Sequence, residues 1–240
     1  MNKHFASAFV ASLSACAAAS ADIVFNNVIA PPGGTAPSYT ASGSNPNTFM
    51  GGRYQLAAGT NRIDMITVTA ANLTASAVTY LRATVYVWDN INTGTVTATD
   101  PAFSGLLGTY SADFNLTSTP LATGTFDLFE VSMGKSGLNI ADTLLGITVN
   151  LQASTDGVTY SSIQALTSII TYGVPAFVGS NPANGFYRNA AGESNGNFNS
   201  GLRTLGLTNQ NIGLIIEGVP APGALALLGV AGLAGSRRRR

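Results

Sequence analysis

The side chains that most often carry out catalysis are nearly absent from this chain of 240 residues. Its one cysteine, Cys16, and its one histidine, His4, both lie within the first 21 residues. Ser-His-Asp and Cys-His catalysis need an imidazole beside the nucleophile, and protein zinc sites are built largely from Cys and His. Residues 22–240 can build none of these, and they contain no G-x-x-x-x-G-K-[ST] phosphate-binding loop. The chemistry that remains is that of carboxylates alone, such as a glycosidase pair, or an oxygen-ligated calcium site.

Neither of these sites has a clear signal in the sequence. Residues 88–94 (Trp-Asp-Asn-Ile-Asn-Thr-Gly) invite comparison with a calcium loop, but Ile91 stands where the EF-type pattern needs an oxygen ligand. A hairpin turn is the expected structure there. No closely spaced acidic pair stands out elsewhere. We therefore predict no metal, no cofactor and no catalytic residue, and a protein that is not an enzyme.

A strand predicted over residues 78–88 offers a candidate binding face. If its alternate apolar residues are buried, the opposite surface presents Tyr80, Arg82, Thr84, Tyr86 and Trp88. Exposed aromatic rings with an arginine between them can stack on the apolar C–H face of a sugar ring. Tyr and Trp are usually buried over most of their area, so burial of this face under a second sheet or a loop is the expected arrangement. Glycan binding by Tyr80, Arg82, Tyr86 and Trp88 is the alternative hypothesis.

Three shorter patterns have plain structural interpretations. Residues 179–202 are rich in Asn and Gly, which suits an irregular surface loop, although long loops are often functional. The tripeptides beginning at Asn72 and Asn115 match the N-glycosylation pattern, but a pattern this short recurs by chance.

The N-terminus has the organisation of a signal peptide. Lys3 precedes an apolar run, and the run closes with Ala19-Ser20-Ala21, the small-x-small pattern of a signal-peptidase site. Cleavage there would make Asp22 the first residue of the mature chain. An alternative is lipidation at Cys16, because residues 13–16 (Leu-Ser-Ala-Cys) resemble a bacterial lipobox.

The C-terminus has the organisation of a membrane anchor. An uncharged run of 19 residues separates Glu217 from Arg237, Arg238, Arg239 and Arg240. A helix of that length reaches roughly 28 Å, close to the thickness of a bilayer's hydrocarbon core. Arginines directly after the run should stay in the cytoplasm, which leaves the preceding residues outside.

This tail also carries a specific pattern: Val219, Pro220, Ala221 and Pro222, then the apolar run 223–235, then the four arginines. In this order of parts it resembles a bacterial PEP-CTERM sorting signal, although Ala221 stands where the family usually has Glu. The resemblance covers about a tenth of the chain. It implies that an exosortase-type transpeptidase in the membrane processes the tail and releases or transfers the protein.

The composition characterises the part of the chain that lies between the signal peptide and the sorting segment. The chain divides into a signal peptide (1–21), one domain (22–216) and a sorting segment (217–240). The 11 acidic residues all lie between Asp22 and Glu217, where only 6 of the 11 cations lie, so the exported part carries a net charge of about −5. That balance argues against a nucleic-acid partner. Charged residues make up only 9% of the chain, so we expect hydroxyl and amide side chains on the surface to keep the protein soluble.

The body has the pattern of short strands separated by turns. Residues 66, 68 and 70 are apolar and alternate with threonines, as in a strand buried on one face. Strands are predicted at 23–25, 53–56, 63–71, 78–88, 124–132, 144–151 and 211–217, with weaker ones at 106–107, 158–160 and 169–172. Residues 161–170 are the one short stretch that could be helical. The expected fold is all-β, an antiparallel β-sandwich or jelly-roll-like domain.

These observations together predict an exported protein of the cell envelope, cell surface or extracellular matrix. The leading expectation is a structural or adhesive role in a polysaccharide-rich layer. The alternatives are a non-catalytic carbohydrate-binding module and, third, a carboxylate-based glycosidase.

Overall fold

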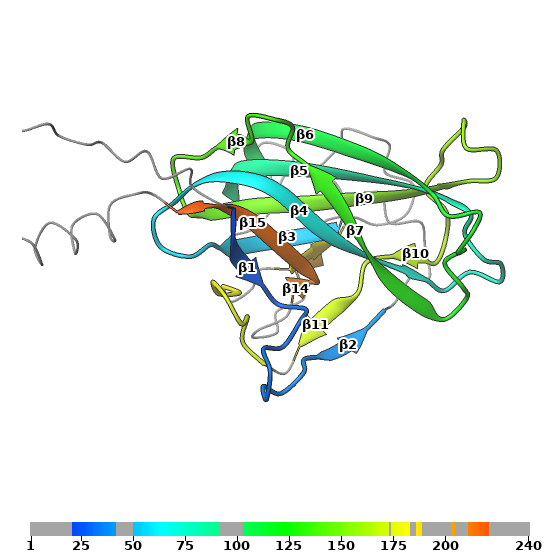
Figure 1. The fold of residues 1–240 in the computed structure, drawn as a ribbon, viewed down its shortest axis with the longest axis horizontal. Helices are drawn as coiled ribbons and strands as arrows, with labels where there is room; N and C mark the ends of the chain where they lie inside the picture. Colours follow the sequence, from blue (N-terminus) through cyan, green and yellow to red (C-terminus); the bar gives the residue numbers. More distant parts are fainter. Residues whose placement is uncertain are drawn as a thin grey trace, which may run out of the picture.

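The computed structural model describes residues 21–41, 50–91, 103–172, 174–182, 186–188, 203–204 and 211–220. Every regular element within these ranges is a β-strand, and the strands pair in antiparallel ladders (Figure 1). The all-β, antiparallel prediction is confirmed.

The strands form two large sheets and one small sheet. The first sheet contains β1 (Asp22–Asn26), β15 (Leu214–Pro220), β4 (Thr60–Asn72), β10 (Leu166–Thr167), β7 (Thr125–Ser132) and β8 (Leu138–Asn139). The second sheet runs in the order β13 (Arg203–Thr204), β12 (Phe186–Arg188), β3 (Met50–Gln55), β9 (Leu144–Ser154), β5 (Tyr80–Ile91) and β6 (Phe103–Asn115). The small sheet is β14 (Asn211–Ile212), β11 (Ile170–Tyr172) and β2 (Ser38–Thr40).

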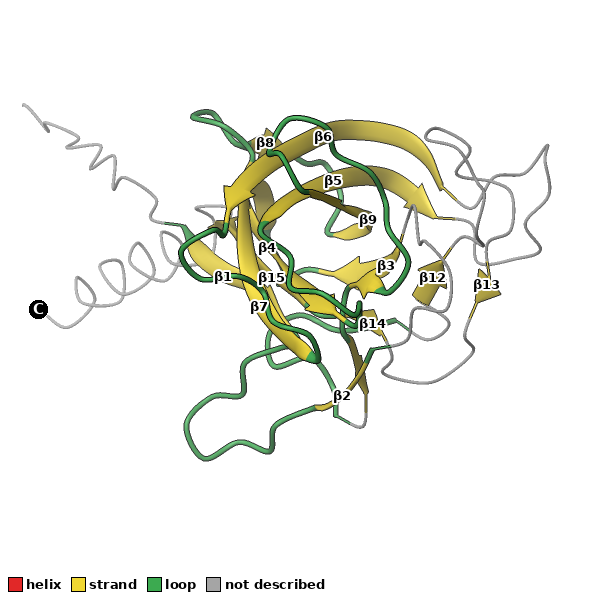
Figure 2. Ribbon diagram, turned by 90° about the vertical axis from the view of Figure 1, so that its right-hand side faces the viewer, coloured by secondary structure: helices red, strands yellow, loops and turns green. Residues whose placement is uncertain are grey.

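One apolar core fills the space between the two large sheets, which curve around it (Figure 2). The first sheet contributes residues such as Ile66 and Val68, and the second contributes residues such as Val85. Two pairs of aromatic rings join one large sheet to the other: Phe25 of β1 packs edge-on against Tyr54 of β3 at 5.1 Å, and Phe114 of β6 packs against Phe129 of β7 at 4.9 Å. The inward side chains of the second sheet are therefore fixed by packing, which determines what its outer face presents.

Strand β4 is buried on both faces. Ile66, Val68 and Ala70 point into the core, as their alternation predicts, but Thr69 on the opposite face is also 0% exposed. A second, smaller apolar cluster lies on that opposite face and consists of Val28, Ala71, Ile169 and Ile215. The prediction of a half-buried strand was wrong here, because segments far away in the sequence cover the second face.

Amide and hydroxyl side chains satisfy the backbone in this covered layer. Asn27 is 2% exposed; its Oδ1 accepts from the N–H of Leu214 at 2.8 Å, and its Nδ2 donates to the carbonyl of Ile212 at 2.9 Å and to Oγ1 of Thr171 at 3.0 Å. One side chain thus connects the end of β1 to β14, β15 and β11. Part of the polar composition that we expected on the surface is used inside the domain.

The last strand extends past the predicted end of the domain. β15 pairs with β4 as far as Val219 opposite Arg62 and Pro220 opposite Thr60. β15 therefore continues four residues beyond residue 216, and the first half of the Pro motif belongs to the sheet. A Cβ at Gly218 would lie 2.2 Å from the carbonyl oxygen of Arg62, so only glycine fits this close approach of two strands.

Residues 221–240 of the predicted sorting segment (217–240) and residues 1–20 of the predicted signal peptide lie outside the described residues. Within the described ranges, no helix has the length and apolar character needed to cross a bilayer.

Most predicted strands are present, with shifted ends, but three details differ. Residues 161–170 contain β10 and no helix, and residues 158–160 form no strand. The weak prediction at 106–107 lies within a 13-residue strand, β6. Its Gly, Asp and Asn residues have low strand propensity, and pairing along the whole of β5 overrides that preference.

Replacing Asn27 with Leu should lower the free energy of unfolding by about 2–4 kcal/mol, because the N–H of Leu214 and the carbonyl of Ile212 would be left buried without partners. Urea denaturation would measure the loss. Asn139→Leu, the same change at an exposed strand position, is the control and should shift stability by no more than about 0.5 kcal/mol. Equal losses in both variants would contradict this account of Asn27.

Tyr54 is a buried residue whose substitution should stabilise the domain. Its side chain is 0% exposed, its hydroxyl has no hydrogen-bond partner, and burial raises its pKa well above the usual value. Tyr54→Phe should therefore raise the free energy of unfolding by about 1 kcal/mol. The matched control is Tyr39→Phe, which should lower it by about 1 kcal/mol, because the Tyr39 hydroxyl donates to the carbonyl of Val28 at 2.8 Å. Thermal and urea unfolding of the two variants should show shifts of opposite sign.

Candidate functional site

The candidate site lies on the outer face of the second sheet, across β6, β5 and β9. Leu81, Ala83, Val85 and Val87 of β5 fill the core, so the residues between them turn outward. The ladder places these residues in three rows across the strands: Asp113–Arg82–Gln152, Ser111–Thr84–Asn150 and Thr109–Tyr86–Thr148. Seven of these nine side chains line an open groove of about 470 Å³: Arg82, Thr84, Tyr86, Thr109, Ser111, Asp113 and Gln152. We refer to this feature as the outer groove.

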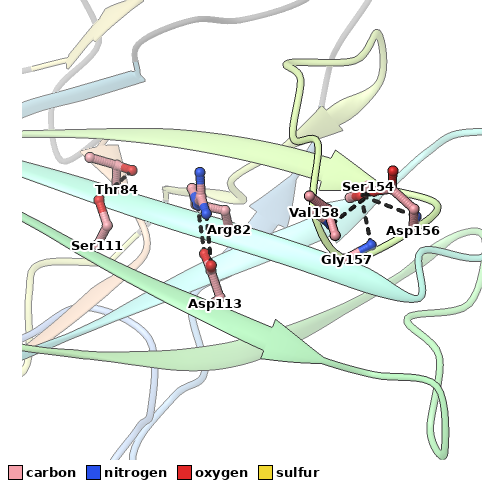
Figure 3. A network of polar contacts seen from close by, with 8 residues as sticks. All are labelled: Arg82, Thr84, Ser111, Asp113, Ser154, Asp156, Gly157 and Val158. Carbon is pink, nitrogen blue, oxygen red and sulfur yellow. Dashed lines mark hydrogen bonds and ion pairs between the residues drawn. The ribbon is translucent and has the colours of Figure 1, made fainter.

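An ion pair forms one end of the outer groove (Figure 3). Arg82 donates two parallel hydrogen bonds to Asp113, from Nε at 2.6 Å and from Nη2 at 2.7 Å. These hydrogen bonds are the main cause of a lowered pKa for Asp113 and a raised pKa for Arg82. With side chains 35% and 48% exposed, the pair contributes little to stability, but its bidentate geometry fixes both groups in place. The ring of Tyr160 covers the guanidinium, whose central carbon lies 4.1 Å from the ring centre.

Hydroxyl groups form the middle of the groove, and an aromatic ring lies at the far end. Thr84 and Ser111 share a hydrogen bond of 2.8 Å across the strands. Tyr86 is half-buried, and desolvation raises its pKa. Its ring stacks on that of Trp88, with centroids 6.3 Å apart and planes at 23°. The groove therefore combines one partly accessible ring with several neutral hydrogen-bonding groups.

The predicted aromatic platform is only partly present. Trp88 is 5% exposed, and its Nε1 donates to Oγ1 of Thr148 at 3.1 Å, so Trp88 cannot offer a stacking surface. Tyr80 is half-buried beside Gly157, where a Cβ would come within 2.9 Å of its ring. Alternation identified the correct face for Arg82 and Tyr86. It could not show what covers the two ends of the strand.

The loop after β9 borders the ion-pair end of the groove (Figure 3). Asp156 organises this loop: its Oδ1 accepts hydrogen bonds from Oγ of Ser154 at 2.7 Å and from the N–H groups of Val158 at 2.8 Å and Thr159 at 2.9 Å. The bond from Ser154 is the largest cause that lowers the pKa of Asp156 to about 2. Gly157 takes a φ of +73° at the turn, a conformation that other residues rarely adopt. The loop leads directly into Tyr160, so it positions the ring above Arg82.

The two glycosylation patterns lie in different environments. The Nδ2 of Asn72 donates to the carbonyls of Ser76 and Leu121, and the residue is 0% exposed, so this pattern is a structural turn. Asn115 lies at the exposed end of β6, where its Oδ1 accepts from the N–H and hydroxyl of Thr117.

Other predicted sites are described in part. Within the described ranges, no group of three or more His, Cys, Asp or Glu side chains is placed to hold a metal ion. Most of the polar loop 179–202 and residues 92–94 of the calcium-like turn lie outside the described residues. The same holds for Ala19, Ala221, Pro222 and the four terminal arginines, whereas Ala21 and Asp22 are described and exposed.

Comparison with protein-family models, with curated proteins and with solved structures finds no match to this chain.

The hydrogen bonds of Asp156 predict how the stability of the folded state depends on pH. A lowered pKa means that the loop's hydrogen bonds favour the folded state fully above about pH 4, the usual pKa of a free aspartate. That contribution is lost as the pH falls through about 2. Carboxyl titration by NMR should give Asp156 a pKa of about 2, and Ser154→Ala should raise it. Ser118→Ala, at an exposed serine elsewhere, should leave the titration unchanged; an unchanged pKa in Ser154→Ala would contradict the assigned cause.

Proposed function

We propose that this chain is an exported all-β protein of the cell surface or extracellular matrix, with a structural or adhesive role. Residues 1–21 would direct export, and the C-terminal segment would hold the protein in the membrane until an exosortase-type transpeptidase processes it. The observation that carries this proposal is the position of the two ends of the domain. β1 begins at Asp22 and β15 ends at Pro220, and Asp22 pairs with Gly218 in the first sheet. The folded domain thus occupies the span between the predicted signal-peptidase site and the second half of the sorting motif.

The pairing of β15 limits where processing could occur. Val219 is 6% exposed and, with Pro220, belongs to the β15–β4 ladder. A protease acting on the folded domain would therefore have to cut after Pro220, because an earlier cut would require β15 to leave the sheet. Ala221 and Pro222 would then be the first residues of the sorting motif beyond the ladder.

We also propose that the domain is a jelly-roll-like β-sandwich. The chain alternates between the two large sheets several times, from β3 to β4 to β5 and from β7 to β9 to β10. Such alternation with antiparallel pairing is typical of jelly rolls.

Asp113 in the outer groove is not suited to be the acid of the glycosidase alternative. A glycosidase needs one carboxylic acid that keeps its proton, which requires a raised pKa. The carboxylate in the outer groove has the opposite property, because Arg82 stabilises its ionised form.

Carbohydrate binding remains the second candidate, and the outer groove favours it. Tyr86 and the surrounding hydroxyl and amide groups are side chains that sugar-binding sites use. In this case the protein would adhere to the layer through specific contacts and would not serve only as its building material.

The export proposal predicts the mass of the native protein. Intact-mass analysis of protein from the surface or matrix fraction should give a chain that begins at Asp22 and ends after Pro220. Lipidation at Cys16 would appear as a chain beginning there with the added mass of a lipid. Changing the four terminal arginines to Gln should reduce processing of the tail, because the stop signal of the anchor is lost. Full-length protein in the cytosol would contradict the proposal.

Retention of the native protein on insoluble polysaccharide would separate the two roles. If the protein binds polysaccharide, it should be retained and soluble polysaccharide should release it. If its role is purely structural, it should not be retained.

A further inference from the structure

We propose that Asn115 is a site of N-linked glycosylation, where the side-chain amide receives a sugar from a glycosyl diphosphate. The evidence is the geometry of residues 115–117, at the exposed end of β6, compared with that of the same tripeptide at residues 72–74. This modification goes beyond the roles proposed above, which assign no covalent change to the domain.

The two Asn-Leu-Thr tripeptides of the chain have the same local geometry. The Oδ1 of Asn115 accepts hydrogen bonds from the N–H of Thr117 at 3.0 Å and from its hydroxyl at 2.7 Å. The Oδ1 of Asn72 accepts the corresponding bonds from Thr74, at 2.9 Å and 2.7 Å. In both tripeptides the threonine therefore holds the amide oxygen in place. The difference between them lies in what surrounds the amide nitrogen, which is the atom that a sugar would join.

The fold leaves one of these two nitrogens accessible. The Nδ2 of Asn72 donates to the carbonyls of Ser76 at 2.9 Å and Leu121 at 2.8 Å, and the residue is 0% exposed. Both of its hydrogens are used, and an enzyme cannot reach it in the folded domain. The Nδ2 of Asn115 has no hydrogen-bond partner among the described residues, and the residue is exposed. Asn115 is therefore the tripeptide asparagine that can act as an acceptor.

The chain on either side of Asn115 is accessible as well. Asp113 lies two residues earlier on the same outer face of β6, and both Asp113 and Thr117 are exposed. A transferase can contact these neighbours while β6 stays paired with β5. The position two residues before Asn72 is Ala70, which is 0% exposed in the core. An enzyme would have to unfold β4 to reach that tripeptide.

The transfer involves no oxidation or reduction. The Nδ2 of Asn115 forms a bond to the anomeric carbon of the sugar. The bond between that carbon and the diphosphate oxygen breaks, and the diphosphate leaves with the electron pair. One proton passes from Nδ2 to a base of the transferase. Glycosyl diphosphates are carried on a membrane lipid or on a nucleotide, and both carriers provide the same leaving group.

A glycan at Asn115 would also protect an edge of the second sheet. Among the described strands, β6 pairs with β5 alone, and its 13 residues include a single charged side chain, Asp113. A long edge strand with few charges is prone to pair with another chain. A bulky, hydrated glycan at the end of the strand hinders such pairing and adds solubility to a chain with only 9% charged residues.

The test is mass spectrometry of the native protein from the surface or matrix fraction after digestion with trypsin. Trypsin cuts between the two tripeptides, so the peptide 63–82 contains Asn72 and the peptide 83–135 contains Asn115. The peptide 83–135 should carry hexose or N-acetylhexosamine units on Asn115. The peptide 63–82 should be unmodified and serves as the internal control.

Variants produced in the same cells test the cause of this selection. Asn115→Gln and Thr117→Val should each abolish the modification, because the first lacks the acceptor and the second lacks the hydroxyl that holds Oδ1. Thr117→Ser keeps a hydroxyl and should retain the modification. Thr119→Val is the matched control, since it makes the same change at an exposed threonine outside the tripeptide, and it should leave the modification unchanged. Circular dichroism of each variant shows that the domain has folded.

The outcomes separate this site from the export proposal. An unmodified peptide 83–135 in chains that begin at Asp22 would refute the glycosylation site and leave the export proposal intact. A sugar on the peptide 63–82, or a modification that survives Thr117→Val, would show that the geometry described here does not select the acceptor. Modification confined to chains that begin at Asp22 would support the site with a lipid-linked donor. Modification of chains that retain residues 1–21 would support it with a nucleotide-linked donor in the cytoplasm.

Discussion

The structure depends on the insertion of its last strand between its first strand and β4. β15 pairs with β1 along one edge and with β4 along the other, so the first sheet is continuous only when the C-terminal residues have joined it. The amide of Asn27 reinforces this closure through bonds to Leu214 and Ile212, which lie more than 180 residues away in the chain. Glycine at position 218 permits the approach, because a side chain there would collide with the backbone of β4. Long-range closure of this kind carries a large entropic cost, and buried hydrogen bonds and apolar contacts offset it.

The polar residues of this protein have two separate roles. Thr69, Asn27 and Thr171 lie inside, where they satisfy backbone and side-chain groups between the first sheet and the segments that cover it. Thr84, Ser111 and Gln152 lie on the outer face of the second sheet, where they line the outer groove. A low content of charged residues is compatible with both roles, since burial of a hydroxyl or amide with a partner costs far less than burial of a charge. The one ion pair in the groove lies at its exposed end, where water reduces that cost.

The groove owes its geometry to the core beneath it. Packing of Leu81, Ala83, Val85 and Val87 fixes the orientation of β5, and the ladders to β6 and β9 then set the three rows of outward side chains. A site on paired strands is held more rigidly than one on loops. The loop organised by Asp156 adds one element to this frame, the ring of Tyr160 above Arg82.

The sequence by itself determined the all-β class, most strand positions and the side of β5 on which Arg82 and Tyr86 lie. These follow from alternation, which is a property of neighbouring residues. It also limited the chemistry, because the lack of Cys and His after residue 21 is a matter of composition. Only the tertiary structure decided that Trp88 is covered, that β4 is buried on both faces, and that β15 continues through Val219 to Pro220. Each of these outcomes depends on contacts between residues far apart in the chain, and no local pattern of side chains specifies which distant segment will cover a given face.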